Sequence, residues 1–119
     1  MPIPSQVLSA GNSPLSTLAI SGSGATGLVA VGTTLATALQ LSATWNAITT
    51  SSASTGVALP PTEAGAVVGI RNDSGQTITV YTPTGSTVNA AASNVTLATA
   101  KTMLLFATSA TTWASITSA

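Results

Sequence analysis

The chain has 119 residues, no cysteine and no histidine, and only four charged side chains. These counts exclude disulfide frameworks, thiolate sites and the usual zinc ligands, so we expect no metal and no cofactor. With two basic side chains in all, the sequence lacks the cations that neutralise nucleic-acid phosphates or line a membrane-binding helix, and we expect neither partner.

Catalytic groups are equally scarce. Glu63 and Asp73 are the only carboxylates, and they flank a predicted strand, which separates them by roughly 20 Å. Serine hydroxyls are abundant, but there is no histidine to act as a base and Lys101 is the only lysine. The residues therefore predict a protein that is not an enzyme.

The low charge also bears on the surface. Charged residues make up 3% of the chain, against about 25% in ordinary domains, and mean hydropathy is +0.53. No apolar run approaches the ~18–20 residues of a membrane helix, and serine and threonine supply roughly a third of the chain. One interpretation is a β domain made soluble by hydroxyl groups. The other, which we favour, is a surface covered by further copies or by a partner lattice.

Taken in chain order, residues 1–27 predict an extended N-terminal arm and linker. Proline interrupts the start, and SGSGATG at 21–27 is typical of a flexible linker. We expect the arm to dock on a neighbour, with a frayed terminus as the alternative. The start lacks the features of a signal peptide. The candidate partner-binding residues are Ile3, Leu8, Leu15, Leu18 and Ile20.

Residues 28–119 predict a single β domain. Apolar, β-branched stretches alternate with Gly, Pro, Asn and Ser turn signals every 8–12 residues, which is typical of an antiparallel β-sandwich or jelly-roll-like fold. No amphipathic helix is available to connect parallel strands. Strands are expected at 28–31, 35–41, 45–50, 56–59, 66–71, 76–82, 94–97, 102–108 and 113–117, with 86–93 left open among a weak strand, a turn and a short helix.

Two hairpins are predicted within this domain. The first joins 66–71 to 76–82 through Asn72–Gly75, whose residues suit a tight turn. The second joins the last two strands and places Trp113 opposite Phe106. The strands around the first hairpin are expected to organise the rest of the sheet.

The four charged residues are candidates for charge pairs between subunits. Arg71 is expected to pair with Asp73 or with Glu63 of a neighbouring subunit, and a solvated surface charge is the alternative. The full candidate set is Glu63, Arg71, Asp73 and Lys101.

Residues 56–114 resemble a pattern found in small structural proteins of tailed bacteriophages. The matching segments are GVALP at 56–60, RNDSG at 71–75 and ITVYTPTG at 78–85, followed in order by Asn89, Lys101, Phe106 and Trp113. One departure is Thr82, which separates the Tyr–Pro pair of that pattern.

The resemblance implies a virion component. It suggests a capsid decoration or cement protein on the outer surface of a phage head, made in the host cytoplasm. The expected assembly is a homotrimer bound to the major capsid protein lattice. The alternative is a tail-fibre, tail-tip or baseplate module with a receptor- or glycan-binding role, in which Trp45, Tyr81 or Trp113 stacks on sugars. A secreted adhesin or S-layer-like domain is a third class, which the missing signal peptide disfavours.

Overall fold

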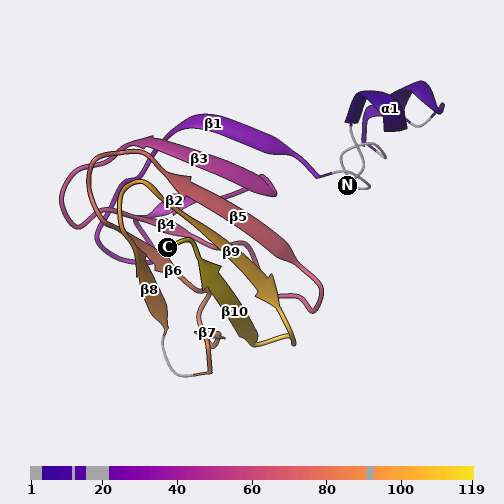
Figure 1. Ribbon diagram of the computed structural model, residues 1–119. Coiled ribbons are helices and arrows are strands. Elements are labelled where there is room, and N and C mark those ends of the chain that lie inside the picture. The colour runs from indigo at the N-terminus through magenta and orange to yellow at the C-terminus, as the bar shows by residue number, and fades with distance from the viewer. Residues whose placement is uncertain (1–3, 12, 16–21, 91–92) are drawn as a thin grey trace.

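The computed structural model describes residues 4–11, 13–15, 22–90 and 93–119 (Figure 1). The short helix α1 precedes a body made of β-strands. The bounds are α1 Pro4–Ser9, β1 Gly24–Val29, β2 Leu39–Gln40, β3 Trp45–Thr50, β4 Gly56–Ala58, β5 Val67–Asn72, β6 Ile78–Tyr81, β7 Thr87–Val88, β8 Asn94–Leu97, β9 Lys101–Ala107 and β10 Thr112–Thr117.

Successive strands alternate between two sheets. Strands β1, β3 and β5 lie side by side and parallel in the six-stranded sheet, and β2, β4 and β6 do the same in the four-stranded sheet. The chain thus winds through stacked coils, each with one strand in either sheet, as in a β-solenoid (Figure 1). Equivalent positions recur from coil to coil, so Gly24, Trp45 and Gly69 are neighbours across three strands.

The C-terminal strands close the stack. Strand β9 pairs antiparallel with β5, β10 pairs antiparallel with β9, and the two-residue β7 forms the far edge of the six-stranded sheet. In the other sheet, β8 pairs antiparallel with β6. The described sheets therefore combine a parallel stack with an antiparallel cap.

The all-β prediction is confirmed, whereas the antiparallel sandwich or jelly roll is wrong. Five of the eight strand pairs are parallel. Parallel strands usually need a helical crossover, which the sequence lacks. Here the strand of the opposite sheet makes the crossover, so no helix is required.

The central hairpin prediction is also wrong. Strands β5 and β6 belong to different sheets, and the segment between them is a corner between the sheets. Its turn residues suit the corner, since Gly75 adopts φ 86°. The C-terminal hairpin is confirmed, but Trp113 pairs with Ala107, and Phe106 pairs with Ala114.

The strand expected at 35–41 is reduced to β2. The backbone amides of Thr37 and Ala38 donate to the carbonyl of Thr34, at 3.2 and 2.9 Å, and turn the chain there. For segment 86–93, where the sequence allowed a weak strand, a turn or a short helix, the structure has the short strand β7.

One hydrophobic core fills the space between the sheets. Its largest side chain is Trp113, which is 1% exposed and donates from Nε1 to Thr62 Oγ1 over 2.9 Å. The aliphatic members alternate along the strands with outward-facing residues, as a period of two requires. They include Leu41, Ile48, Val57, Leu59, Val68, Ile70, Ile78, Val80, Leu97, Met103 and Leu105.

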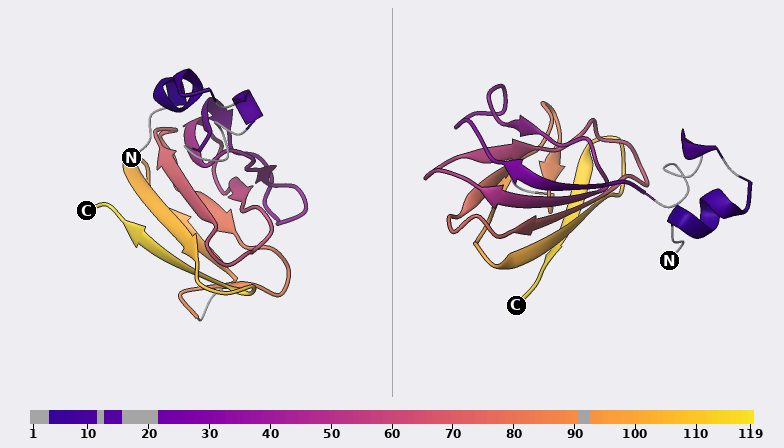
Figure 2. Two further views of the ribbon diagram at one scale, coloured as in Figure 1. Left: turned by 90° about the vertical axis from the view of Figure 1, so that its right-hand side faces the viewer. Right: turned by 90° about the horizontal axis from the view of Figure 1, so that it is seen from above.

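The N-terminal region differs from the expected extended arm. Helix α1 lies apart from the strands, beyond the start of β1 (Figures 1 and 2). Strand β1 begins at Gly24, inside the segment predicted as linker, and pairs with β3. Its register shifts twice between Ala25 and Val29, around Gly27 at φ 67°. The β body therefore starts earlier than residue 28. Among the described residues, no helix has the length and apolar character needed to cross a membrane.

Candidate functional site

The outward face of the six-stranded sheet carries an apolar patch, beside which Arg71 and Thr102 lie opposite each other on β5 and β9. On β5, β9 and β10, every second residue points into the core, so the intervening positions form the outer surface. We call the apolar part of this surface the outer apolar face. It is made by Trp45, Val67, Leu104, Phe106 and Ile116, of which Ile116 is 62% exposed.

Strand register aligns these side chains in rows. Trp45 lies opposite Gly69, Gly69 opposite Leu104, and Leu104 opposite Ile116, which gives a row across β3, β5, β9 and β10. Next to it, Val67 lies opposite Phe106. The contiguity matters because exposed apolar residues that gather in one place mark interaction surfaces, whereas scattered ones do not.

Gly69 lets the indole of Trp45 lie flat on the sheet. A Cβ atom at position 69 would collide with the ring atoms Cε3 and Cζ3 of Trp45. The glycine and the ring together border a small hollow of about 130 Å³, which Leu104 also lines. The outer apolar face therefore has a small hollow next to Trp45.

The four-stranded sheet has a different outer surface. Its outward positions on β6 and β8 are Thr79, Tyr81, Asn94 and Thr96, which are all polar. The two sides of the body thus differ in chemistry: the six-stranded side has an aliphatic and aromatic patch next to Arg71, and the other side is rich in hydroxyls.

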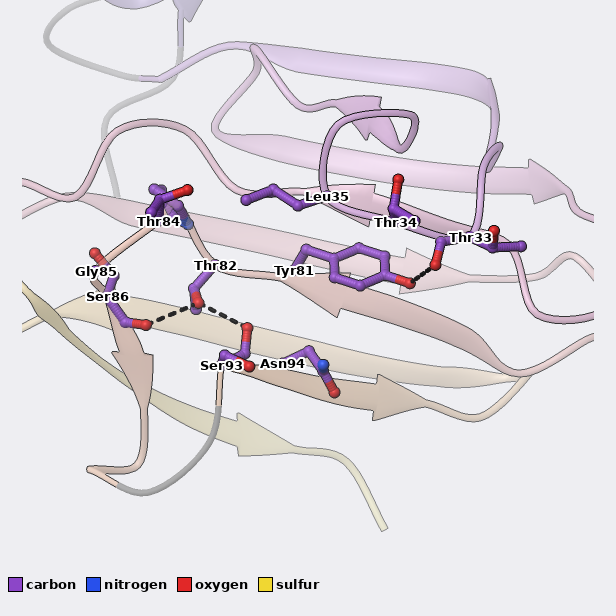
Figure 3. Close-up of a pocket in the computed structure, with 11 residues that line it drawn as sticks. Thr33, Thr34, Leu35, Tyr81, Thr82, Thr84, Gly85, Ser86, Ser93 and Asn94 are labelled. Atoms are coloured by element: carbon purple, nitrogen blue, oxygen red, sulfur yellow. Dashed lines mark hydrogen bonds between the residues drawn. The ribbon is translucent and has the colours of Figure 1, made fainter.

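A pocket of about 510 Å³ opens at one end of this polar surface (Figure 3). Its walls come from the 33–35 segment, from the turn that follows β6, and from the start of β8. The lining is neutral throughout. It consists of Thr33, Thr34, Leu35, Tyr81, Thr82, Pro83, Thr84, Gly85, Ser86, Ser93 and Asn94.

Hydrogen bonds fix the walls of this pocket. The Tyr81 hydroxyl donates to the carbonyl of Thr33 over 2.8 Å. The buried Thr82 hydroxyl is within 3.0 Å of the Ser86 carbonyl and 2.7 Å of the Ser93 carbonyl. Figure 3 shows these contacts at opposite ends of the Tyr81–Thr82 segment. They hold three chain segments around the pocket.

Gly56 makes room for the ring of Tyr81 in the wall of the pocket. A Cβ atom at position 56 would lie 2.7 Å from Cε2 of Tyr81 and 2.5 Å from the carbonyl oxygen of Thr79. The tyrosine ring therefore packs against the backbone of β4.

Two of the four charged candidates form an ion pair in the part of the chain that the structure describes, and the other two do not. Arg71 and Asp73 form an ion pair within the chain, with Nη2 and Oδ1 2.9 Å apart, and both are about half exposed. Arg71 also donates to the carbonyl of Ala100. In the described regions, Glu63 and Lys101 belong to no ion pair. Glu63 precedes β5 and Asp73 follows it, which agrees with the predicted separation of the two carboxylates.

The arm candidates are described only in part. Leu8 and Leu15 are exposed, at 47% and 79%. Ile3, Leu18 and Ile20 lie outside the described residues. The two visible leucines have the exposure that a docking segment requires.

The three aromatic candidates for sugar stacking have different surroundings. Trp113 is buried in the core, which rules it out as a surface stacking platform. Trp45 lies on the outer apolar face, and Tyr81 lies in the pocket. Sequence reasoning identified Tyr81 but missed Thr33, Thr84 and Asn94 around it, because these residues are distant in the chain and share no motif.

Two buried asparagines were not predicted either. Asn72 is fully buried; its Nδ2 donates to the carbonyls of Gln76 and Leu97, and its Oδ1 accepts from the amide and hydroxyl of Ser74. Asn46 donates to two carbonyls, but its Oδ1 has no partner in the described part of the chain. Asn72 is thus structural, because its hydrogen-bonding capacity is satisfied within the fold.

Comparison of the chain with protein-family models, with curated proteins and with solved structures found no match in any of the three.

Proposed function

We propose that this protein is a non-enzymatic structural component of a bacteriophage particle, a decoration or cement protein that binds the outside of the head. Its role is mechanical: copies pack against one another and against the major capsid protein lattice, and so stabilise the shell. A homotrimer is the assembly that the phage resemblance suggests.

The observation that carries this proposal is the outer apolar face. Water-exposed aliphatic and aromatic side chains at Trp45, Val67 and Ile116 lie in register over neighbouring strands. Covering such a face gains about 25 cal/mol for each Å² of apolar surface removed from water. The scarcity of charge supports the same conclusion, since little like-charge repulsion opposes contact between copies.

The arm supplies a second contact in this proposal. Helix α1 lies apart from the body (Figure 2). Leu8 and Leu15 are exposed to solvent. An arm that reaches a neighbour adds to the body contacts through multivalency, because each further contact forms within an already bound lattice.

The oligomeric state of the protein tests whether the outer apolar face is an interface between copies. We expect the native chain to associate in size-exclusion chromatography with light scattering, and Ile116→Ser to dissociate without loss of structure, because Ile116 is largely exposed. Val31→Ser is the matched control, since Val31 is also an exposed aliphatic residue but lies outside the face. A native chain that stays monomeric at high concentration contradicts the proposal.

Copy number distinguishes the head from the tail. Quantitative mass spectrometry of purified particles should find the protein at a level comparable to the major capsid protein. A level comparable to tail proteins instead supports the alternative, a tail-fibre, tail-tip or baseplate module.

A further inference from the structure

The pocket beside Tyr81 has the properties of a binding site. Its volume of about 510 Å³ lies within the range of roughly 300–1,000 Å³ that is usual for small-molecule sites. The hydrogen bonds of Tyr81 and Thr82 fix its walls before any ligand arrives. A preformed wall lowers the entropy cost of binding.

Several polar groups in the pocket remain available. The hydroxyls of Thr33, Thr84 and Ser93 and the amide of Asn94 make no hydrogen bond to any part of the protein that the structure describes. Thr33 and Asn94 lie beside the phenol ring of Tyr81, and Thr84 and Ser93 lie farther along the pocket (Figure 3). Three hydroxyls and an amide both donate and accept, so they can match hydroxyl groups on a ligand.

The lining also limits the charge of the ligand. No Arg, Lys, Asp or Glu borders the pocket, so nothing there compensates a phosphate, a carboxylate or an amine. The apolar part of the lining is the Tyr81 ring with Leu35 and Pro83. A matching ligand is therefore neutral, rich in hydroxyl groups and apolar on one side.

We infer that this pocket binds a neutral saccharide, with a sugar ring against Tyr81 and its hydroxyls on Thr33, Thr84 and Asn94. Pyranose rings combine an apolar C–H face with a rim of hydroxyls, which is the pattern that the lining offers. This inference is independent of the proposed structural role, because the pocket and the outer apolar face lie on different sheets.

The single tyrosine provides a direct measurement. Because Tyr81 is the only tyrosine in the chain, its ring signals in an NMR spectrum are unambiguous. The probes are the methyl glycosides of glucose, galactose, mannose and N-acetylglucosamine, titrated into the millimolar range. We expect at least one of them to shift the Tyr81 signals saturably, and glucuronic acid to bind more weakly than its neutral counterpart.

Variants connect the signal to the pocket. Thr84→Ala and Asn94→Ala remove free polar groups and should weaken binding by roughly fivefold or more. Thr96→Ala is the matched control, because Thr96 is exposed on the same strand as Asn94 but does not line the pocket. Since none of these side chains bonds to the described protein, the variants should fold normally.

Three results overturn the inference. The first is that none of the neutral sugars shifts the Tyr81 ring of the folded protein. The second is a shift that Thr84→Ala and Asn94→Ala leave unchanged. The third is binding of glucuronic acid that equals or exceeds that of the neutral sugars. None of these results bears on oligomeric state, so failure here is distinguishable from failure of the proposed structural role.

Discussion

The side chain of Asn72 joins the corner after β5 to strand β8. It donates to the carbonyls of Gln76 and Leu97 at 2.8 and 2.9 Å, and all of its polar atoms are buried. Removing it takes the Nδ2 donor from the buried contact with the Leu97 carbonyl, where water does not replace it, while the Gln76 carbonyl keeps its contact with the Ser74 hydroxyl.

Asn72→Ala should therefore lower the free energy of unfolding by roughly 2–3 kcal/mol. Urea denaturation followed by circular dichroism measures this change. Gln76→Ala is the control in the same corner; its side chain is exposed, and the expected change lies within about 0.5 kcal/mol. Equal effects of the two substitutions would show that Asn72 has no special role.

The contact between Gly69 and Trp45 gives a second prediction at this scale. Gly69→Ala should displace the Trp45 indole, because the new methyl group occupies the position of its ring. The indole N–H signal of Trp45 should shift in the NMR spectrum, while that of the buried Trp113 stays in place.

Gly24→Ala is the matched control for this substitution. Gly24 lies opposite Trp45 on the other side, but a Cβ atom there has nothing within 4 Å. If Gly69→Ala leaves the Trp45 signal where it was, the indole does not pack on the sheet as described.

Sequence reasoning reached some of these residues and missed others. It expected Arg71 to pair either with Asp73, two positions away on the chain, or with Glu63 of a neighbouring subunit, and the structure has the pair with Asp73 within one chain. It did not identify Asn72 as buried, because the partner carbonyl of Leu97 is remote in sequence. Local chemistry is visible in a sequence, whereas a contact between distant segments depends on the fold.

Among the elements, the turn between β8 and β9 contains a strained residue. Ala100 has φ 64°, a left-handed conformation that costs a residue with a Cβ atom roughly 1–2 kcal/mol. Its amide donates to the carbonyl of Asn72 over 2.6 Å, which holds the turn against β5.

Ala100→Gly should therefore stabilise the protein by about 0.5–1 kcal/mol, since relief of the strain exceeds the greater entropy of glycine in the unfolded chain. Thermal unfolding by calorimetry measures the effect. Ala98→Gly, two residues earlier and without a positive φ, should be neutral or destabilising. A lower melting temperature for Ala100→Gly contradicts the assigned backbone conformation.

The positions of the strands along the chain were easier to predict than the strands with which they pair. Alternation and turn residues located β3, β5 and β9 closely, because both signals are local. The pairing of β9 with β10 was predicted correctly, but the placement of β5 and β6 in different sheets was missed. An Asn–Asp–Ser–Gly segment fits a hairpin and a corner between sheets equally well, and only packing in three dimensions separates the two. The same holds for the pocket, whose walls come from three distant segments.

At the scale of the whole molecule, the nature of the outer face predicts how association responds to salt. In the proposed assembly, the contacts of Trp45, Val67 and Ile116 are apolar, so screening of charges should affect them little. Sulfate should strengthen them, because it is excluded from protein surfaces and favours burial.

Sedimentation velocity tests this at low and high sodium chloride and in ammonium sulfate. We expect a nearly constant association constant in chloride and a larger one in sulfate. Steep weakening with sodium chloride would instead point to the charged residues Glu63, Arg71, Asp73 and Lys101 as the basis of assembly.

The irregular edge strand β1 has a consequence for contacts between sheets of neighbouring molecules. A regular, unpaired edge invites the next molecule to add a strand and grow into a fibre. The register shifts around Gly27 interrupt the backbone groups that such growth needs, and the opposite edge of the same sheet is only the two residues of β7. The two edges of the six-stranded sheet therefore offer another molecule little regular backbone with which to pair.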